Sequence, residues 1–186
     1  MDNANSATSV SYTTIVDGSS MDLRATHFGG VEPRFGKIYI MKAKVRVTDK
    51  MVESAIVVFD MKSFTVENFD DEASKVKLTR HLQNEGFFNV REYSSSTFEL
   101  TKIESLDGKF NSSLTGNLTI LDVTKSIAFM ANVDISDDEM NIVSEDFAID
   151  RRDWGIKYNV EGTEGVTVDY IVANEIGFTI NVRISK

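Results

Sequence analysis

Hydrophobic and polar residues alternate along most of this chain, most clearly in residues 116–133. Leu118 and Ile120 belong to one apolar row, and residues 122–125 interrupt the pattern as a turn. A second apolar row follows the turn and consists of Ile127, Phe129, Ala131 and Val133. Side chains at every second position lie on one face of a strand. Consecutive hairpins with one apolar face must bury these faces against each other, which predicts a barrel or a sandwich.

The same alternation predicts strands elsewhere in the chain, namely in residues 12–16, 21–25, 37–47, 55–61, 96–105, 147–149, 166–170 and 176–184. A change of parity between Ile40 and Ala43 predicts a β-bulge near Met41 and Lys42. Both parities are apolar in residues 55–61, so we expect this strand to be covered on both faces. About eight or nine strands at this spacing are typical of a small all-β barrel or sandwich.

Residues 68–86 break the β pattern and predict one helix. The acidic run at residues 70–72 supplies a cap and a first turn that suit the positive end of the helix dipole. Residues 73–83 contain good helix formers, and Gly86 is the expected stop. We expect this helix to lie over an open end or a side of the sheet.

Composition and charge narrow the class of protein. The chain has 186 residues, of which 41% are hydrophobic, and we interpret residues 12–186 as one domain behind a flexible arm at residues 1–11. The net charge of −9 argues against nucleic acid and anionic membrane surfaces as partners. The absence of cysteine excludes disulfides and thiolate metal sites. No apolar run reaches about 18 residues, so no membrane-spanning helix is expected.

The first residues are polar and contain no hydrophobic segment of the kind that signal peptides carry. Two interpretations of this start stay open. Met1 is either the beginning of a natural cytosolic chain or a substitute for a removed export signal.

Residues that could carry catalysis or bind a metal are sparse. His27 and His81 are the two histidines, and neither lies in an H-x-H or H-E-x-x-H spacing. The serine cluster at residues 94–96 lacks the G-x-S-x-G context of a hydrolase nucleophile. The acidic runs at residues 70–72 and 137–139 are interpreted as helix caps and turns. We therefore expect no enzyme activity, no cofactor and no metal ion.

Three stretches, in this order and spacing, resemble the YceI-like family. The first is residues 81–90, HLQNEGFFNV, followed by Tyr93 and Phe98. The second is residues 114–125, LTGNLTILDVTK, which is similar to the family's G-x-L-T-I-x-G-V-T-K hairpin. The third is residues 147–158, FAIDRRDWGIKY, which is similar to its I-[ND]-R-x-D-[FW]-G-I-x-Y run.

The chain departs from the family pattern at three positions. Asp122 replaces a glycine of the hairpin turn, and Ser94 replaces a proline. Arg34 stands where the family often has an early histidine, which puts in doubt any contact of that histidine with a ligand head group.

The resemblance implies an extended, antiparallel, eight-stranded, lipocalin-like barrel with one short helix. It implies that the barrel binds and transports or sequesters a long-chain amphiphilic lipid, such as an isoprenoid quinone, a polyprenyl compound or a fatty acyl derivative. It also implies a periplasmic or exported protein, with the signal absent from this chain, and a barrel that can pair as a homodimer. An eight-stranded barrel is just wide enough either to be filled by its own side chains or to hold one small ligand.

Large residues on the inward rows and near the predicted mouth are the candidate ligand contacts. They are Phe87, Phe88, Tyr93, Phe98, Phe129, Phe147, Trp154, Ile156, Tyr158 and Phe178. For each phenylalanine, closing the core is an alternative role. The charge cluster at residues 151–153 is interpreted first as an ion pair or a clamp on a turn, and second as a grip on a head group.

Two further functions stay open at this point. One is a barrel with a solid core that acts through its surface as a structural or interaction protein of the cell envelope, related to stress. The other is a small enzyme that acts on a lipid inside the barrel, which would need a pair of buried ionisable groups.

Overall fold

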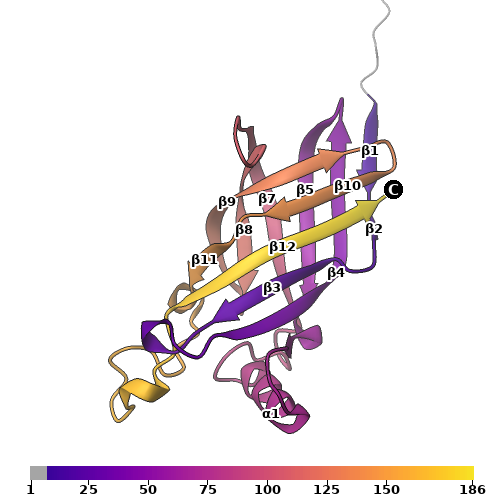
Figure 1. Cartoon of the computed structure of the whole chain (residues 1–186). Helices are drawn as coiled ribbons and strands as arrows, with labels where there is room; N and C mark the ends of the chain where they lie inside the picture. Colours follow the sequence, from indigo (N-terminus) through magenta and orange to yellow (C-terminus); the bar gives the residue numbers. More distant parts are fainter. Residues whose placement is uncertain (1–7) are drawn as a thin grey trace, which may run out of the picture.

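The computed structural model describes residues 8–186 and contains one closed antiparallel β-barrel of eight strands (Figure 1). Around the barrel the strands follow the order β4-β3-β12-β10-β9-β8-β7-β5, and β5 pairs with β4 to close it. The barrel strands are β3 (Ser20–Ala25), β4 (Arg34–Thr48), β5 (Met51–Asp60), β7 (Ser95–Ser105), β8 (Ser112–Ile120), β9 (Val123–Ile135), β10 (Glu139–Ser144) and β12 (Glu175–Ser185). The eight-stranded barrel expected from the resemblance is therefore confirmed.

Four short strands extend the barrel wall. They are β1 (Ser9–Tyr12), β2 (Thr14–Ile15), β6 (Thr65–Val66) and β11 (Phe147–Asp150). Strands β1 and β6 pair with β4, and β2 and β11 pair with β12. The prediction of a flexible arm at residues 1–11 is wrong for residues 9–11, because Ser9–Tyr12 form a strand that pairs with β4. Residues 1–7 of that arm lie outside the described residues.

The β8–β9 hairpin is tighter than the sequence pattern predicts. Leu121 and Asp122 form its two-residue turn, with φ angles of 51° and 58°. Two successive residues with positive φ match the right-handed twist of the flanking strands. Residues 123–125, expected in the turn, therefore belong to β9.

Other strand predictions have mixed outcomes. The bulge is confirmed by a register shift between Ile40 and Lys42 in the β4–β5 pair. The expected cover on both faces of β5 is wrong at Ile56, which is 40% exposed. The predicted strand at residues 166–170 is wrong, because this segment is a loop containing the short 3-10 helix η4 (Val168–Tyr170). The pattern did not predict β10, which lies between β9 and β12.

Helix α1 (Glu72–Gln83) lies at the lower end of the barrel, next to β6 (Figure 1). Asp71 caps its N-terminus, since Oδ1 accepts a hydrogen bond from the Ser74 N–H at 2.7 Å. The helix ends at Gln83, with Asn84 as its C-cap, before the expected stop at Gly86. Gln83 ties the last turn to the barrel by donating from Nε2 to the Phe64 carbonyl oxygen at 3.1 Å. Of the two positions expected for the helix, an open end or a side of the sheet, the structure has the end (Figure 1).

The inward row of β12 confirms the alternation on which the prediction rested. Its five alternate apolar residues are all buried: Ile176, Phe178, Ile180, Val182 and Ile184. Strand β12 lies in the middle of the wall, paired with β3 on one side and β10 on the other. It offers no open edge for a second copy.

Gly116 gives the first testable prediction. A Cβ atom at this position would collide with the Phe98 ring and would lie 2.6 Å from the Glu99 carbonyl oxygen. Because backbone oxygen cannot move away as a flexible side chain can, we expect Gly116→Ala to lower the free energy of unfolding by roughly 1–3 kcal/mol. Urea unfolding followed by the fluorescence of Trp154 measures this change. Gly108→Ala is the matched control, since a Cβ at Gly108 meets nothing within 4 Å. Equal stabilities of the two variants would contradict the prediction.

Candidate functional site

The barrel encloses a narrow apolar cavity. The cavity, taken as the space open to the centre of a water molecule, has a volume of about 20 Å³. Ser96 is the one polar residue among its lining side chains, and its hydroxyl contacts the sulfur of Met61 at 3.3 Å. The remaining lining residues are Met21, Leu23, Ile38, Phe59, Met61, Phe88, Phe98, Leu118, Ile120, Ile127, Phe129, Phe147, Phe178 and Ile180.

A series of four aromatic rings crosses this cavity. Phe129 and Phe147 are stacked, with ring centroids 4.6 Å apart and an interplanar angle of 8°. Phe98 lies 5.5 Å from Phe129 on one side, and Phe178 lies 5.8 Å from Phe147 on the other. These rings come from four strands, β7, β9, β11 and β12. The interior is narrow because these four rings contact one another across it.

Two further spaces follow the barrel cavity toward the lower end of the molecule. We call the nearer one the middle space and the farther one the outer pocket. Phe88 lines both the barrel cavity and the middle space, and Phe87 lines both the middle space and an outer pocket. The outer pocket admits the centre of a water molecule over about 190 Å³, against about 40 Å³ for the middle space. The three spaces thus form a row, and the two adjacent phenylalanines stand at its two boundaries.

The outer pocket is mainly apolar and has a few polar groups at its wall. His27 comes from the loop between β3 and β4, Arg34 is the first residue of β4, and His81 comes from the last turn of α1. The His27 Nδ1 atom is buried and has no hydrogen-bond partner among residues 8–186. His81 packs edge-on against Tyr158, with ring centroids 4.8 Å apart. Mainly apolar walls with a small number of polar groups are the usual make-up of small-molecule sites.

Arg34 is oriented by its neighbours. Its Nη2 atom lies 3.2 Å from the Glu32 carboxylate, and its guanidinium carbon lies 4.6 Å from the centre of the Phe69 ring. The residue that replaces the family's early histidine therefore does line a pocket, together with both histidines of the chain.

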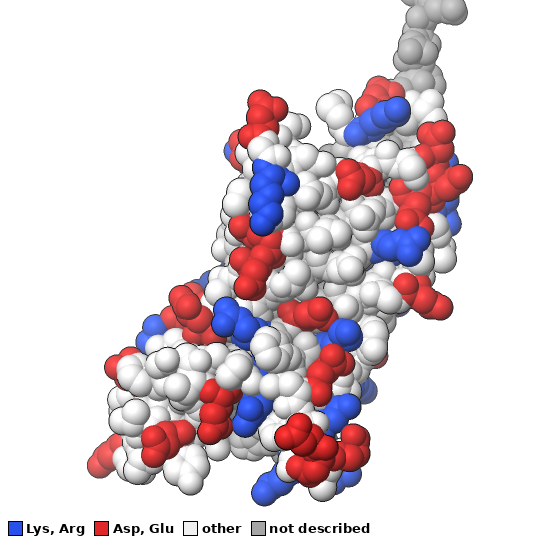
Figure 2. Space-filling view, viewed as in Figure 1, with Lys and Arg blue, Asp and Glu red and all other residues white. Residues whose placement is uncertain are grey.

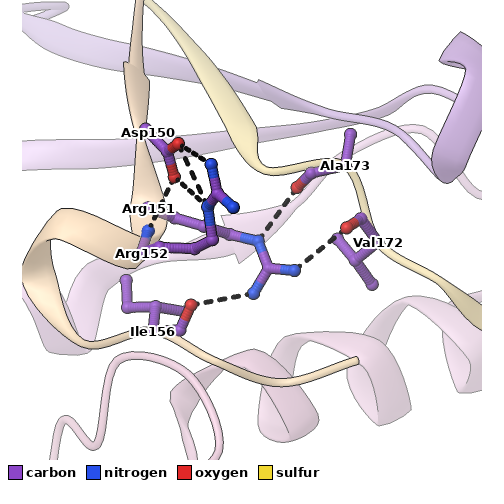
Figure 3. Close-up of polar contacts among 6 residues, drawn as sticks. All are labelled: Asp150, Arg151, Arg152, Ile156, Val172 and Ala173. Carbon is purple, nitrogen blue, oxygen red and sulfur yellow. Dashed lines mark hydrogen bonds and ion pairs between the residues drawn. The ribbon is translucent and has the colours of Figure 1, made fainter. Parts of the chain in front are cut away.

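Arg151 is a fully buried cation that holds this end of the barrel together (Figure 3). It belongs to the 3-10 helix η3 (Arg151–Trp154), directly after β11. Its guanidinium donates to three backbone carbonyl oxygens, those of Ala173 at 2.9 Å, Ile156 at 3.0 Å and Val172 at 3.0 Å. Burial lowers the pKa of Arg151, and the nearby carboxylate of Asp150 opposes this shift. Since an arginine in a protein stays protonated, the three oxygens face a permanent charge.

The neighbouring Arg152 forms the ion pair of this cluster. Its Nε atom donates to Asp150 Oδ1 at 2.9 Å, and its side chain is half exposed (Figure 3). The Arg152 guanidinium holds the pKa of the Asp150 carboxyl below its ordinary value. The interpretation of residues 151–153 as an ion pair and a clamp is thus supported by both arginines.

The ten candidate ligand residues divide into three groups. Phe88, Phe98, Phe129, Phe147 and Phe178 line the barrel cavity, and Phe87 and Tyr158 line the outer pocket. The remaining three, Trp154, Ile156 and Tyr93, line none of the three spaces. Trp154 is buried, and its indole N–H donates to the Leu118 carbonyl oxygen at 3.1 Å, which gives it a role in the core. The charge of Glu92 raises the pKa of Tyr93.

Sequence reasoning missed most aliphatic lining residues and all polar ones of the outer pocket. Inward parity on predicted strands was a signal for Leu118, Ile120 and Ile127. No local signal places His27 and His81 on the wall of one pocket, because they come from the β3–β4 loop and from α1, which are far apart in the sequence. Among residues 8–186, no cluster of three or more histidine, cysteine or acidic residues could hold a metal ion. Within the same range, no helix is long and apolar enough to cross a membrane.

Comparisons with known proteins agree with this architecture. The sequence model of the YceI-like domain matches residues 12–184. A sequence search finds no match to a protein of curated function. The structure is similar to that of BcnA from Burkholderia cenocepacia, with a TM-score of 0.67 and 17% identity, covering 89% of this chain and 95% of that one.

Two other solved structures are similar. One is a polyisoprenoid binding domain from Saccharophagus degradans implicated in plant cell wall breakdown, with a TM-score of 0.64, 11% identity, and coverage of 94% of this chain and 98% of that one. The other is the YCEI protein of Campylobacter jejuni, with a TM-score of 0.53, 22% identity, and coverage of 73% and 74%. At these identities the structures establish a common fold.

Proposed function

The chain belongs to the YceI-like domain family, and from that premise we propose that it binds a long-chain amphiphilic lipid and carries or sequesters it without chemical change. The lipid chain occupies the barrel cavity and the head group occupies the outer pocket. Isoprenoid quinones, polyprenyl compounds and fatty acyl derivatives all have the required shape. The polyisoprenoid binding domain with the same fold supports the first two classes.

The row of three spaces is the observation that carries this proposal. An amphiphile needs a long apolar channel for its chain and a wider, partly polar space for its head. The barrel cavity and the middle space have mainly apolar walls, with Arg34 as the one charged residue beside the middle space. The outer pocket adds His27 and His81 to Arg34. This polarity gradient orients a ligand with its chain inward.

A lipid chain requires the interior to widen. The present opening of about 20 Å³ is close to the size of one water molecule. Phe88, Phe129 and Phe147 are the side chains whose rotation joins the cavity to the middle space and opens its centre. The lost ring contacts are replaced by contacts with the lipid chain, so the apolar surface stays buried.

A barrel with a packed core that acts through its surface is the second candidate function. The same small opening favours it, because a cavity of this size needs no ligand to be stable. In this case the aromatic series closes the core, and the function lies on the outside of the barrel.

Absence of catalysis, export to the periplasm and pairing as a homodimer belong to the proposal as well. The apolar lining of the barrel, with Ser96 alone as a polar side chain, supports a non-catalytic interior. Export to the periplasm rests on the chain's membership of the YceI-like domain family. Pairing as a homodimer does not use an edge of β12, which is paired on both sides within the closed wall.

Native mass spectrometry of the purified protein, followed by organic extraction, tests the proposal. We expect a mass excess of a few hundred daltons that extracts as a long-chain amphiphile, and a higher melting temperature after addition of a quinone, a polyprenol or a fatty acid. A mass that equals the chain alone, together with no stabilisation by any of the three lipids, contradicts lipid binding and favours the packed-core function.

A further inference from the structure

Four apolar side chains project from two neighbouring loops at the lower end of the barrel. Phe28 and Val31 lie between β3 and β4, and Val168 and Tyr170 lie between β11 and β12. They are 44%, 57%, 62% and 67% exposed, respectively. We call these four residues the apolar rim. Single exposed apolar residues are common, whereas a cluster of them marks an interaction surface.

Backbone hydrogen bonds hold the two loops side by side. The Phe28 N–H donates to the Ile171 carbonyl oxygen at 2.9 Å, and the Ala173 N–H donates to the Thr26 carbonyl oxygen at 2.9 Å. Figure 1 shows the two loops, indigo and yellow, next to each other at the lower left. The apolar rim is therefore a fixed feature of the fold, although its parts are far apart in the sequence.

The same loops line the outer pocket. His27 lies next to Phe28, and Tyr170 itself contributes to the pocket wall together with Val172. The apolar rim thus flanks the space that leads toward the barrel cavity. A molecule that enters this pocket from the side of the two loops passes the rim.

The charges around the rim are mostly negative. The two loops carry five acidic residues, Glu32, Asp153, Glu161, Glu164 and Asp169, against three basic ones, Arg151, Arg152 and Lys157. Of the basic residues, Arg151 is buried and Arg152 pairs with Asp150. Figure 2 shows mainly white and red atoms at the lower left end of the molecule. This distribution opposes binding to anionic lipids, whose surface potential repels acidic groups. It does not oppose an electrically neutral bilayer.

The shape and size of the rim favour a bilayer over a protein partner. A stable protein interface buries about 800 Å² of accessible surface on each partner and involves about 20–30 residues a side. The rim has four apolar residues on two protruding loops. A few apolar and aromatic side chains on such tips suit shallow, reversible insertion at the level of the lipid head groups.

We propose that the apolar rim docks the lower end of the barrel onto an electrically neutral lipid bilayer, from which the outer pocket receives its ligand. The second half of this statement rests on the proposed lipid-binding function, whereas the docking itself does not. Contact at the rim places the outer pocket at the membrane surface, so that a lipid chain need not cross water.

Flotation with vesicles tests the docking. The triple variant F28S/V31S/V168S removes three rim residues that line none of the three spaces. The matched control Y39S/M41S/M51S removes three residues that are 50%, 45% and 70% exposed elsewhere on the barrel. We expect the wild type and the control to float with phosphatidylcholine vesicles and the rim variant to lose binding by about tenfold or more. Vesicles rich in phosphatidylglycerol are expected to bind the wild type more weakly.

Transfer of pyrene-labelled hexadecanoic acid separates docking from ligand binding. Delivered from ethanol, the fatty acid is expected to bind the rim variant and the wild type equally, while its transfer from vesicles is slower for the rim variant. Failure of both proteins to bind the fatty acid from ethanol contradicts the lipid-binding function and leaves flotation to decide the docking. Wild type that does not float, or a rim variant that floats as well as the control, overturns the docking. Tighter binding to anionic than to neutral vesicles also overturns the docking. So does a wild type that does not float with vesicles but binds a basic protein through the apolar rim.

Discussion

Replacing Arg151 by methionine is expected to lower the free energy of unfolding by roughly 2–5 kcal/mol. The substitution leaves three carbonyl oxygens, those of Ile156, Val172 and Ala173, without their donors. No backbone N–H of residues 8–186 donates to these oxygens in the structure. Removal of a buried charge is favourable by itself, but each buried oxygen left unpaired costs about 1–3 kcal/mol. The three unpaired oxygens therefore outweigh the removed charge, and the net change in the free energy of unfolding is a loss.

The neighbouring residue provides the control for this substitution. Arg152→Met removes a half-exposed guanidinium that pairs with Asp150, and such surface pairs contribute about 0–1 kcal/mol. Urea unfolding followed by Trp154 fluorescence compares the two variants, since Trp154 is the single tryptophan and is buried. Similar losses in both variants would show that the clamp contributes no more than a surface ion pair.

The Arg151 variant is also expected to loosen the outer pocket. The oxygens that Arg151 holds lie at the two ends of residues 157–171, and this segment supplies Tyr158, Asn159 and Tyr170 to the pocket wall. Hydrogen exchange at the Phe28 and Val172 amides, which bond across the same region, reports this change. We expect faster exchange there in the Arg151 variant and unchanged exchange in β8 and β9. Uniformly faster exchange over the whole barrel would indicate global destabilisation alone.

Phe88→Ala is expected to join the barrel cavity to the middle space and to cost about 3–5 kcal/mol of stability. Phe88 is buried, and its ring lies 5.8 Å from that of Phe64 and 6.4 Å from that of Phe87. Since the ring stands between two apolar spaces, its removal leaves a larger cavity that the surroundings fill only in part. Tyr39→Ala, at an exposed aromatic residue on the outer face of β4, is the control with little expected loss.

The ligand response of the Phe88 variant distinguishes the two candidate functions. If the barrel binds lipid chains, pyrene-labelled hexadecanoic acid is expected to enter the variant faster than the wild type and to restore part of its lost stability. Ligand that binds only the folded state raises the free energy of unfolding with its concentration. A variant that is destabilised and does not respond to the fatty acid would support a packed core.

The resemblance in three stretches and the alternation of apolar residues predicted the barrel correctly for a physical reason. A strand that buries one face needs an apolar residue at every second position, and β8, β9 and β12 carry this pattern almost without interruption. The helix was predictable as well, because Asp71 and the helix formers after it act within one turn of the chain. The predictions failed where the pattern was short or weak, as in β10, or where apolar residues lie on a loop, as at Val168 and Tyr170.

The sequence by itself therefore determined most of the strands, the cap of the helix and the inward rows of the barrel, since these depend on residues close together in the chain. Only the tertiary structure decided which aromatic rings line the cavity and which close the core, because the positions of Phe88 and Trp154 depend on contacts between distant segments. It also decided that Arg151 clamps three backbone oxygens, that His27 and His81 share a pocket, and that two loops join as an apolar rim. Each of these features depends on contacts between segments that lie apart in the sequence, and no local pattern in the sequence records these contacts.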